Sequence, residues 1–181
     1  MRAFYRLIYF KLLGWKISGE FPPDLKKYIV AVAPHTSNWD FPIGVMVRSI
    51  MCMQNTKFLG KSALFKPPFG WFFRALGGYP VDRSKHTDMV QQVADIFAKH
   101  EFFAIAIAPE GTRQKVDKLK SGFYYIAKRA AIPIIPCGFD FSKKTVVIAK
   151  PFYPSANAEN DMKFLMDFYR SITGKNPELG I

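Results

Sequence analysis

An apolar run that ends in a polar turn sets the strongest limit on the fold of this chain. Residues 28–33 are continuously apolar, which is typical of a buried strand. Pro34 ends this strand because proline cannot donate to a sheet ladder. Residues 39–53 then predict a helix, with Ser37 or Asn38 as its N-terminal cap. A strand that leads into a helix is typical of α/β folds, which place ligand sites at the carboxyl ends of strands.

The rest of the chain repeats this alternation. Further strands are predicted at residues 56–61, 79–83, 102–108, 134–139 and 145–149, and further helices at 88–99, 121–131 and 159–172. The pattern predicts a single-domain α/β sandwich, in which helices flank a central mixed, largely parallel sheet. A chain of 181 residues is long enough to bury the core of such a domain. We expect residues 1–20 to carry an amphipathic N-terminal helix and residues 21–181 to form the main body.

The N-terminal segment leaves two alternatives open. In a helix over residues 2–17, one face would carry Phe4, Leu7, Ile8 and Trp15, and the opposite face would carry Arg2, Arg6 and Lys16. Such a helix can lie in a membrane surface, with its apolar face in the lipid. It can equally pack that face on its own domain.

The charge of the chain predicts an anionic partner. Lysine and arginine number 26 against 14 aspartates and glutamates, which gives a net charge of +12. Nucleic acid, an anionic membrane surface and a phosphorylated small molecule all fit this excess. The basic residues are spread along the chain and no nucleic-acid motif accompanies them, so we expect no nucleic-acid partner.

The same composition bears on metals and on the compartment. The two cysteines, Cys52 and Cys137, lack metal or redox spacing, and three histidines offer no ligand set, so we expect no metal site. No apolar run approaches the length of a transmembrane helix, and the N-terminus lacks the features of a signal peptide. We therefore expect a cytoplasmic protein.

His35 and Asp40 are the first candidates for catalysis. The carboxylate of Asp40, five positions after His35, could hold one ring nitrogen as N–H and leave the other nitrogen free to accept a proton. The alternative is structural: His35 would bond the turn, and Asp40 would face water near a helix start.

Other polar residues follow predicted strands in the same way. The strand at 102–108 ends at Pro109, and the sequence Glu110-Gly111-Thr112-Arg113 follows. Arg83 ends the short extended piece at 79–83. Polar and oppositely charged groups at matching ends of buried strands are hard to explain by packing alone. They favour a functional site at this edge of the sheet.

The order of these motifs resembles that of the glycerolipid acyltransferase family, which includes lysophosphatidic acid acyltransferases. Four blocks within residues 30–140 carry the resemblance: His35–Asp40, Lys61–Gly70 with Gly77–Arg83, Pro109–Arg113 and Ile132–Pro136. One departure is Ala108, where the family usually has phenylalanine. A second departure is the short chain, which leaves no room for the longer N-terminal helical segment of some relatives.

The resemblance implies an O-acyltransferase of phospholipid biosynthesis. Such an enzyme moves a fatty acyl group from a thioester, on coenzyme A or acyl carrier protein, to the hydroxyl of a lysophospholipid or glycerol-phosphate-type acceptor. His35 would be the general base and Asp40 its orienting partner, with no cofactor beyond the thioester co-substrate. Arg83 and Arg113 would bind the acceptor phosphate, in a pocket shaped by Glu110, Gly111 and Thr112.

Three further expectations accompany the resemblance. Lys61 is a weaker candidate for phosphate or donor contact and could be a plain surface lysine. The chain would work peripherally, on the inner face of the cell membrane. The rival interpretations are a basic, aromatic nucleic-acid-binding module and a non-catalytic membrane-surface protein.

Overall fold

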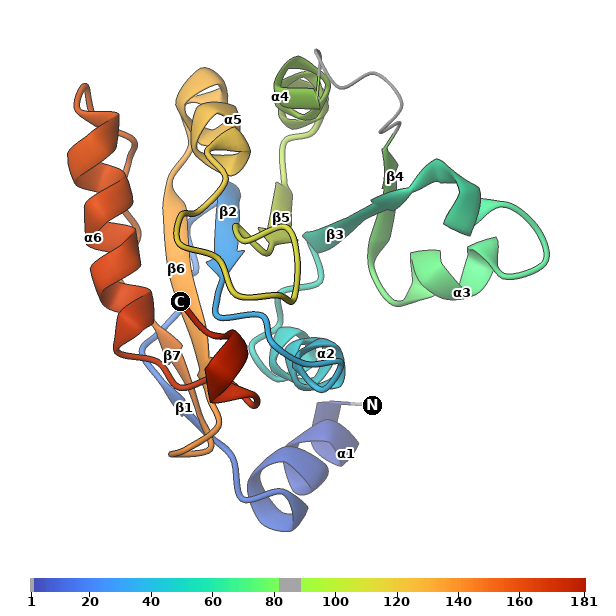
Figure 1. Ribbon diagram of the computed structural model, residues 1–181. Helices are drawn as coiled ribbons and strands as arrows, with labels where there is room; N and C mark the ends of the chain where they lie inside the picture. Colours follow the sequence, from blue (N-terminus) through green and yellow to red (C-terminus); the bar gives the residue numbers. More distant parts are fainter. Residues whose placement is uncertain (1, 82–88) are drawn as a thin grey trace.

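A seven-stranded sheet forms the middle layer of a three-layer α/β sandwich in the computed structural model, which describes residues 2–81 and 89–181 (Figure 1). The strands are β1 (Lys16–Ser18), β2 (Lys27–Val32), β3 (Thr56–Lys61), β4 (Gly78–Val81), β5 (Phe103–Ile107), β6 (Ile134–Asp140) and β7 (Thr145–Ile148). Their order is β1-β7-β6-β2-β5-β3-β4. Every neighbouring pair is parallel except β6 and β7, which are antiparallel. The predicted mixed, largely parallel sheet is confirmed.

Helices cover both faces of the sheet (Figure 1). They are α1 (Arg2–Arg6), η1 (Leu7–Leu12), α2 (Asp40–Ile50), η2 (Ser62–Phe65), α3 (Gly70–Ala75), α4 (Met89–Lys99), α5 (Gly122–Ala130), α6 (Ala158–Arg170) and η4 (Pro177–Leu179). One face packs against α4, α5 and α6, and the other against α2 and the N-terminal segment.

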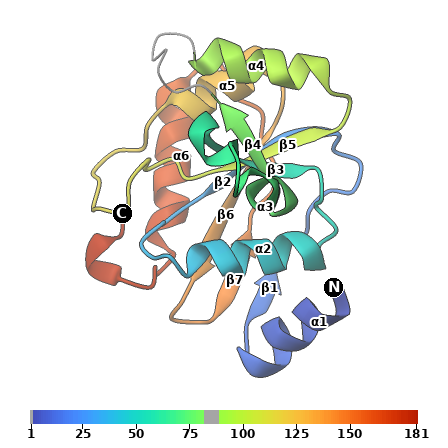
Figure 2. The same ribbon diagram turned by 90° about the vertical axis from the view of Figure 1, so that its right-hand side faces the viewer.

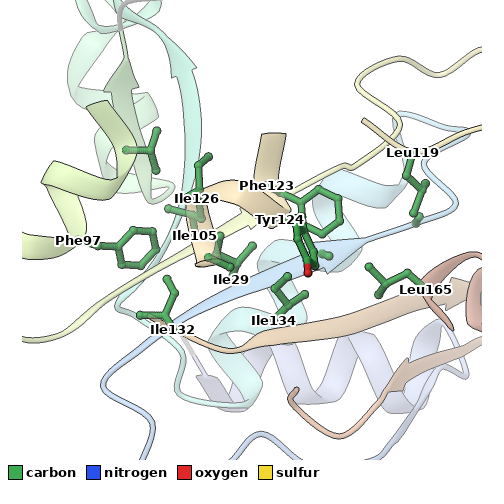
Figure 3. Close-up of a cluster of buried hydrophobic side chains, with 14 of the residues drawn as sticks. Ile29, Phe97, Ile105, Leu119, Phe123, Tyr124, Ile126, Ile132, Ile134 and Leu165 are labelled. Atoms are coloured by element: carbon green, nitrogen blue, oxygen red, sulfur yellow. The ribbon is translucent and has the colours of Figure 1, made fainter. Parts of the chain in front are cut away.

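Alternation along β2 divides the core between these two faces. Ile29 points to the side of α4, α5 and α6, where it joins Ile105 of β5 and Ile134 of β6 (Figure 3). Val30, the next residue, points to the α2 side and packs in the second cluster with Ile43. Successive side chains of a strand point to opposite faces, so a continuously apolar strand can fill both cores.

The predicted helix over residues 2–17 is wrong in its length. Helical structure ends at Leu12, the chain turns at Gly14 with a positive φ of 68°, and β1 then joins β7. Trp15 is buried, and so is Tyr9, whose hydroxyl donates to the Lys16 carbonyl at 3.0 Å. Trp15 therefore belongs to the core and does not share an exposed face with Phe4.

Two local expectations also differ from the structure. Trp39, and neither Ser37 nor Asn38, occupies the N-cap position of α2, and its side chain makes no capping hydrogen bond; the Ser37 hydroxyl accepts from the Trp39 N–H at 3.2 Å. Between β3 and β4, where the sequence predicted no helix, the structure contains η2 and α3. No helix among the described residues is long and apolar enough to cross a membrane.

Candidate active site

The turn between β2 and α2 holds His35 against Asp40. The His35 Nδ1 atom lies 2.8 Å from the Asp40 Oδ2 atom. The same oxygen accepts the Ser37 N–H at 3.0 Å. Asp40 is 3% exposed and is the first residue of α2, where the helix N-terminus favours a negative charge. This contact fixes the tautomer with a proton on Nδ1, so the lone pair of Nε2 points away from Asp40.

The side chain of Arg113 faces the Nε2 lone pair of His35. Its Nε atom donates to the His35 Nε2 atom at 3.3 Å. A guanidinium can only donate, so the contact requires the same tautomer that Asp40 imposes. β2 and β5 are adjacent and parallel, which brings the turn after β2 and the loop after β5 to one edge of the sheet. A permanently charged guanidinium therefore faces the His35 ring on the side away from Asp40.

Glu110 holds the histidine turn from inside the protein. It is 1% exposed, and its Oε2 atom accepts the His35 N–H at 2.7 Å. Gly111 follows with a φ of +68°, a left-handed backbone conformation that favours glycine. The Thr112 hydroxyl accepts the Gln114 N–H at 3.2 Å and closes the loop locally.

Burial raises the pKa of Glu110 from its ordinary value of 4.5 to about 7. The hydrogen bond from the His35 N–H and the charge of a protonated His35 ring oppose this shift, and the nearby Asp40 carboxylate adds to it. At neutral pH a large share of Glu110 is therefore protonated. The buried Tyr169 lies near Glu110, and its hydroxyl donates to the Ala31 carbonyl at 2.6 Å.

This pKa predicts how stability should change with pH. The folded chain binds the Glu110 proton more tightly than the unfolded chain, so the free energy of unfolding should fall as pH rises from about 4.5 to about 7. The total loss is about 3 kcal/mol. Glu110→Gln keeps an acceptor oxygen for the His35 N–H but cannot ionise, and should lack this loss. Urea unfolding of both proteins at pH 5.5, 6.5 and 8 measures the difference; parallel pH profiles would contradict the assignment.

An apolar cavity of about 300 Å³ opens from this site. It lies between α2 and the sheet, with His35, Asp40 and Arg113 in its lining. Apolar residues from α2, β2, β3 and β5 form much of the remaining wall, among them Val30, Val32, Phe41, Val45, Phe58 and Ala106. Arg48 also lines the cavity, but its guanidinium bonds the carbonyls of Thr56 and Gln54 at 2.7 Å each. The cavity can therefore take a long apolar group whose reactive end lies beside His35.

The structure brings together most of the site residues predicted from sequence. His35, Asp40, Glu110 and Arg113 meet at one edge of the sheet, with Gly111 and Thr112 in the same loop. Lys61 ends β3, which β5 separates from β2. Arg83 lies outside the described residues. Within the described ranges, no group of three or more histidine, cysteine or acidic side chains could hold a metal ion.

Sequence reasoning missed two parts of the site. The first is the cavity wall, including Gly44 on α2. The helical spacing of Asp40, Gly44 and Val47 was a signal for a shared face, but it did not say that a cavity lies under that face. The second part is a contact from the C-terminal segment to Thr36, for which the sequence carried no signal.

The sequence matches the profile of a known protein family. The profile of the family described as Acyltransferase matches residues 16–140, which include His35, Asp40, Glu110 and Arg113 but not the C-terminal segment. This match covers well over half of the chain.

Two curated proteins are similar in sequence. The 1-acyl-sn-glycerol-3-phosphate acyltransferase of Saccharomyces cerevisiae is 32% identical over 143 residues, which are 75% of this chain and 46% of the relative. The enzyme of the same name from Streptococcus pneumoniae is 30% identical over 134 residues, or 69% of this chain and 49% of the relative. The chain thus spans about half the length of the curated relatives that it matches.

A solved structure shares the fold. The crystal structure of the 1-acyl-sn-glycerophosphate (LPA) acyltransferase PlsC from Thermotoga maritima aligns with a TM-score of 0.60 at 18% identity. The alignment covers 92% of this chain and 74% of that one. At this identity the likeness shows the fold.

Proposed function

The chain belongs to the acyltransferase family, and on that premise we propose that it transfers a fatty acyl group from a thioester to the hydroxyl of a phosphorylated glycerolipid acceptor. The donor would be acyl coenzyme A or acyl carrier protein, and the acceptor a lysophospholipid or a glycerol-phosphate-type molecule. One observation carries the proposal: an apolar cavity ends on a histidine whose Nδ1 atom is held by Asp40 and whose Nε2 atom faces Arg113. The names of the two curated relatives support the same class of reaction.

His35 acts as the general base in this proposal. Its Nε2 atom takes the proton of the acceptor hydroxyl while the hydroxyl oxygen attacks the thioester carbonyl carbon. The tetrahedral intermediate then collapses, the carbon–sulfur bond breaks, and the thiolate leaves with the proton from the imidazolium. The products are an ester and a free thiol. Asp40 stabilises the imidazolium and holds the ring in place.

The cavity receives the acyl chain. Its wall is predominantly apolar, and its volume suits a long hydrocarbon group. Each methylene that leaves water for such a cavity contributes about 0.8 kcal/mol. Binding energy from the chain therefore helps to fix the thioester carbon beside His35.

We assign Arg113 to the acceptor phosphate. It lies beside His35, on the side from which a hydroxyl must reach the Nε2 atom. A guanidinium matches phosphate oxygens in a bidentate way, so a phosphate would draw Arg113 from the histidine and free its lone pair. Arg83 and Lys61 are further candidates for this role. Glu110 contributes indirectly, because its carboxylate bonds the backbone of His35.

Arg113→Ala should act mainly on the phosphorylated acceptor. Loss of a charge-assisted contact costs about 1.5–3 kcal/mol, so the KM for lysophosphatidate should rise roughly tenfold to a hundredfold. The KM for the acyl donor should change little, and Arg83→Ala should behave alike. Arg129→Ala, which removes an exposed charge from α5, serves as the matched control. Equal effects on donor and acceptor would show that Arg113 serves the donor or the fold.

We further propose that the chain works at a membrane surface, peripherally on the cytoplasmic face. Figure 2 looks onto the side of the molecule that carries α2 and α3, with α1 below them. Exposed apolar side chains occur on all three segments: Phe4, Leu7 and Leu12 near the N-terminus, Trp39 and Phe41 at the mouth of the site, and Leu64, Phe69, Trp71 and Phe72 around α3. Single exposed apolar residues are ordinary, but several on segments that lie on the same side of the molecule favour an interaction surface. A lipid surface fits because the proposed acceptor resides there.

Substitution of the α3 aromatics should weaken binding to vesicles. Phe69 and Trp71 are 67% and 71% exposed, so serine at both positions should leave the fold intact. Burial of such a side chain contributes about 1.5–3 kcal/mol, so the double variant should bind at least about tenfold more weakly. Co-sedimentation with vesicles that contain anionic lipid measures this. Phe102→Ser with Tyr153→Ser removes two other exposed aromatics as the control, and equal binding by both double variants would assign α3 another role.

A further inference from the structure

The turn that carries His35 is held from outside by the C-terminal segment. Asn176 donates twice to Thr36, the residue after the histidine: its Nδ2 atom to the Thr36 carbonyl at 2.8 Å, and its backbone N–H to the Thr36 hydroxyl at 3.2 Å. Thr36 is 3% exposed. Gly174 packs on the same residue so closely that a Cβ atom would lie 2.7 Å from the Thr36 hydroxyl oxygen. We call residues 173–181 the C-terminal strap.

The strap is itself fixed along its length. The Thr173 carbonyl accepts the Phe141 N–H at 2.8 Å, which ties the start of the strap to the end of β6. The Asn176 carbonyl accepts the Leu179 N–H at 3.1 Å within η4, and Ile181 packs against the core on the α6 side. In Figure 1 this segment lies beside the start of α2 and the loop that follows β5. The contact with Thr36 therefore comes from an anchored element.

The turn depends on such outside contacts because it has little structure of its own. Residues 33–37 form neither helix nor strand. Glu110 holds the His35 N–H from the inside, and Asp40 holds the ring from the side. Asn176 supplies a further contact, to the backbone carbonyl of Thr36, the residue next to His35. Displacement of a reacting group by about 1 Å can cost about a hundredfold in rate, so the contact from Asn176 bears on turnover.

We infer that Asn176 is a positioning residue for the catalytic base and that it acts through Thr36. The inference rests on the proposed function, since it assigns His35 the role of base. Asn176 also lies outside the part of the chain that the family profile matches, which ends at residue 140. The strap thus couples the C-terminus of this chain to the geometry of the His35–Asp40 pair.

Three variants test the role of Asn176. Asn176→Ala removes the side-chain donor, Asn176→Asp places a carboxylate against the Thr36 carbonyl, and Thr36→Val removes the acceptor hydroxyl. Each should lower kcat by about tenfold to a hundredfold, with Asn176→Asp the most affected, while the KM for the acyl donor changes by less than about twofold. Thr36→Ser keeps the hydroxyl and should retain activity.

Asn157→Ala is the matched control. The Asn157 side chain caps α6 by accepting the Asn160 N–H at 3.0 Å and does not contact the turn. Loss of such a cap costs about 1 kcal/mol of stability. This variant should lower the melting temperature without lowering kcat. If Asn157→Ala loses kcat in the same proportion as Asn176→Ala at equal stability, or if Asn176→Ala keeps wild-type kcat, the inference is wrong.

The NMR signal of the His35 ring proton tests the positioning role of Asn176 without a measurement of acyl transfer. The His35 Nδ1 proton, which is bonded to the buried Asp40, should give a downfield NMR signal in the wild type. In Asn176→Ala and Asn176→Asp this signal should broaden and exchange faster with water, whereas Asn157→Ala should leave it unchanged. An unchanged signal in the Asn176 variants would overturn the positioning role. If the signal responds but no protein transfers acyl groups, the proposed function fails and the positioning role stands.

Discussion

Replacement of His35 by alanine should lower the rate of acyl transfer by about 10²–10⁴-fold, because the reaction loses its general base. The protein should still fold. The His35 side chain is 24% exposed, and the backbone N–H that bonds Glu110 remains in the variant. Single-turnover kinetics with a fixed amount of thioester, at saturating acceptor, isolate the chemical step from binding and release.

Asp40→Asn should lower the rate of acyl transfer by a similar factor, because it changes the tautomer of His35. An amide in place of the carboxylate can donate to Nδ1, which moves the ring proton to Nε2 and removes the acceptor for the hydroxyl proton. His100→Ala is the control for both variants. The His100 ring stacks on Phe103 at 5.1 Å, near the amino end of β5 and away from the site. If the His35→Ala protein is folded and turns over at the wild-type rate, His35 is not the general base.

A leucine at Gly44 should shorten the acyl chain that the protein accepts. Gly44 lies on α2 and lines the cavity, and a Cβ atom there would meet only the Phe139 ring, at 3.6 Å. The added side chain would occupy the part of the cavity that we assign to methylenes of the acyl chain. Exclusion of three or four methylenes costs about 3 kcal/mol, so kcat/KM for a palmitoyl thioester should fall roughly a hundredfold relative to an octanoyl thioester.

Gly44→Ala controls for the change in the helix. A glycine within a helix is less stable than alanine by about 0.5–1 kcal/mol, so this variant should melt at a slightly higher temperature and keep most activity on long chains. The ratio of rates with palmitoyl and octanoyl donors is the measurement for both variants. If Gly44→Leu reduces both rates equally, the cavity does not hold the acyl chain.

Much of the central fold could be predicted because local signals agree there. The continuous apolar runs of β2 and β5 predict buried strands, and the polar residues that follow each run predict a shared edge. His35, Asp40, Glu110 and Arg113 do meet at that edge. The carboxyl ends of adjacent parallel strands must meet, so the topology converts two separate sequence motifs into one site.

The remaining features depend on contacts between distant parts of the chain. The period of the N-terminal segment fits a helix through Trp15, but pairing of β1 with β7 pulls residues 16–18 into the sheet. The burial of Glu110 follows from the way its loop folds under the His35 turn. The strap contact joins Thr36 to Asn176, which are 140 residues apart, and neither residue type indicates the other. No local pattern encodes contacts of this kind.

The most direct test of acyl transfer uses the purified full chain on vesicles that contain lysophosphatidate, with a labelled palmitoyl thioester as donor. Free thiol and labelled product are measured together, by thiol titration and mass spectrometry. We predict that thiol and phosphatidate form in equal amounts with the wild type and that both disappear with His35→Ala. Thiol release without a new ester would show hydrolysis instead of transfer, and a folded wild-type chain that forms no ester on these vesicles would contradict the proposed function.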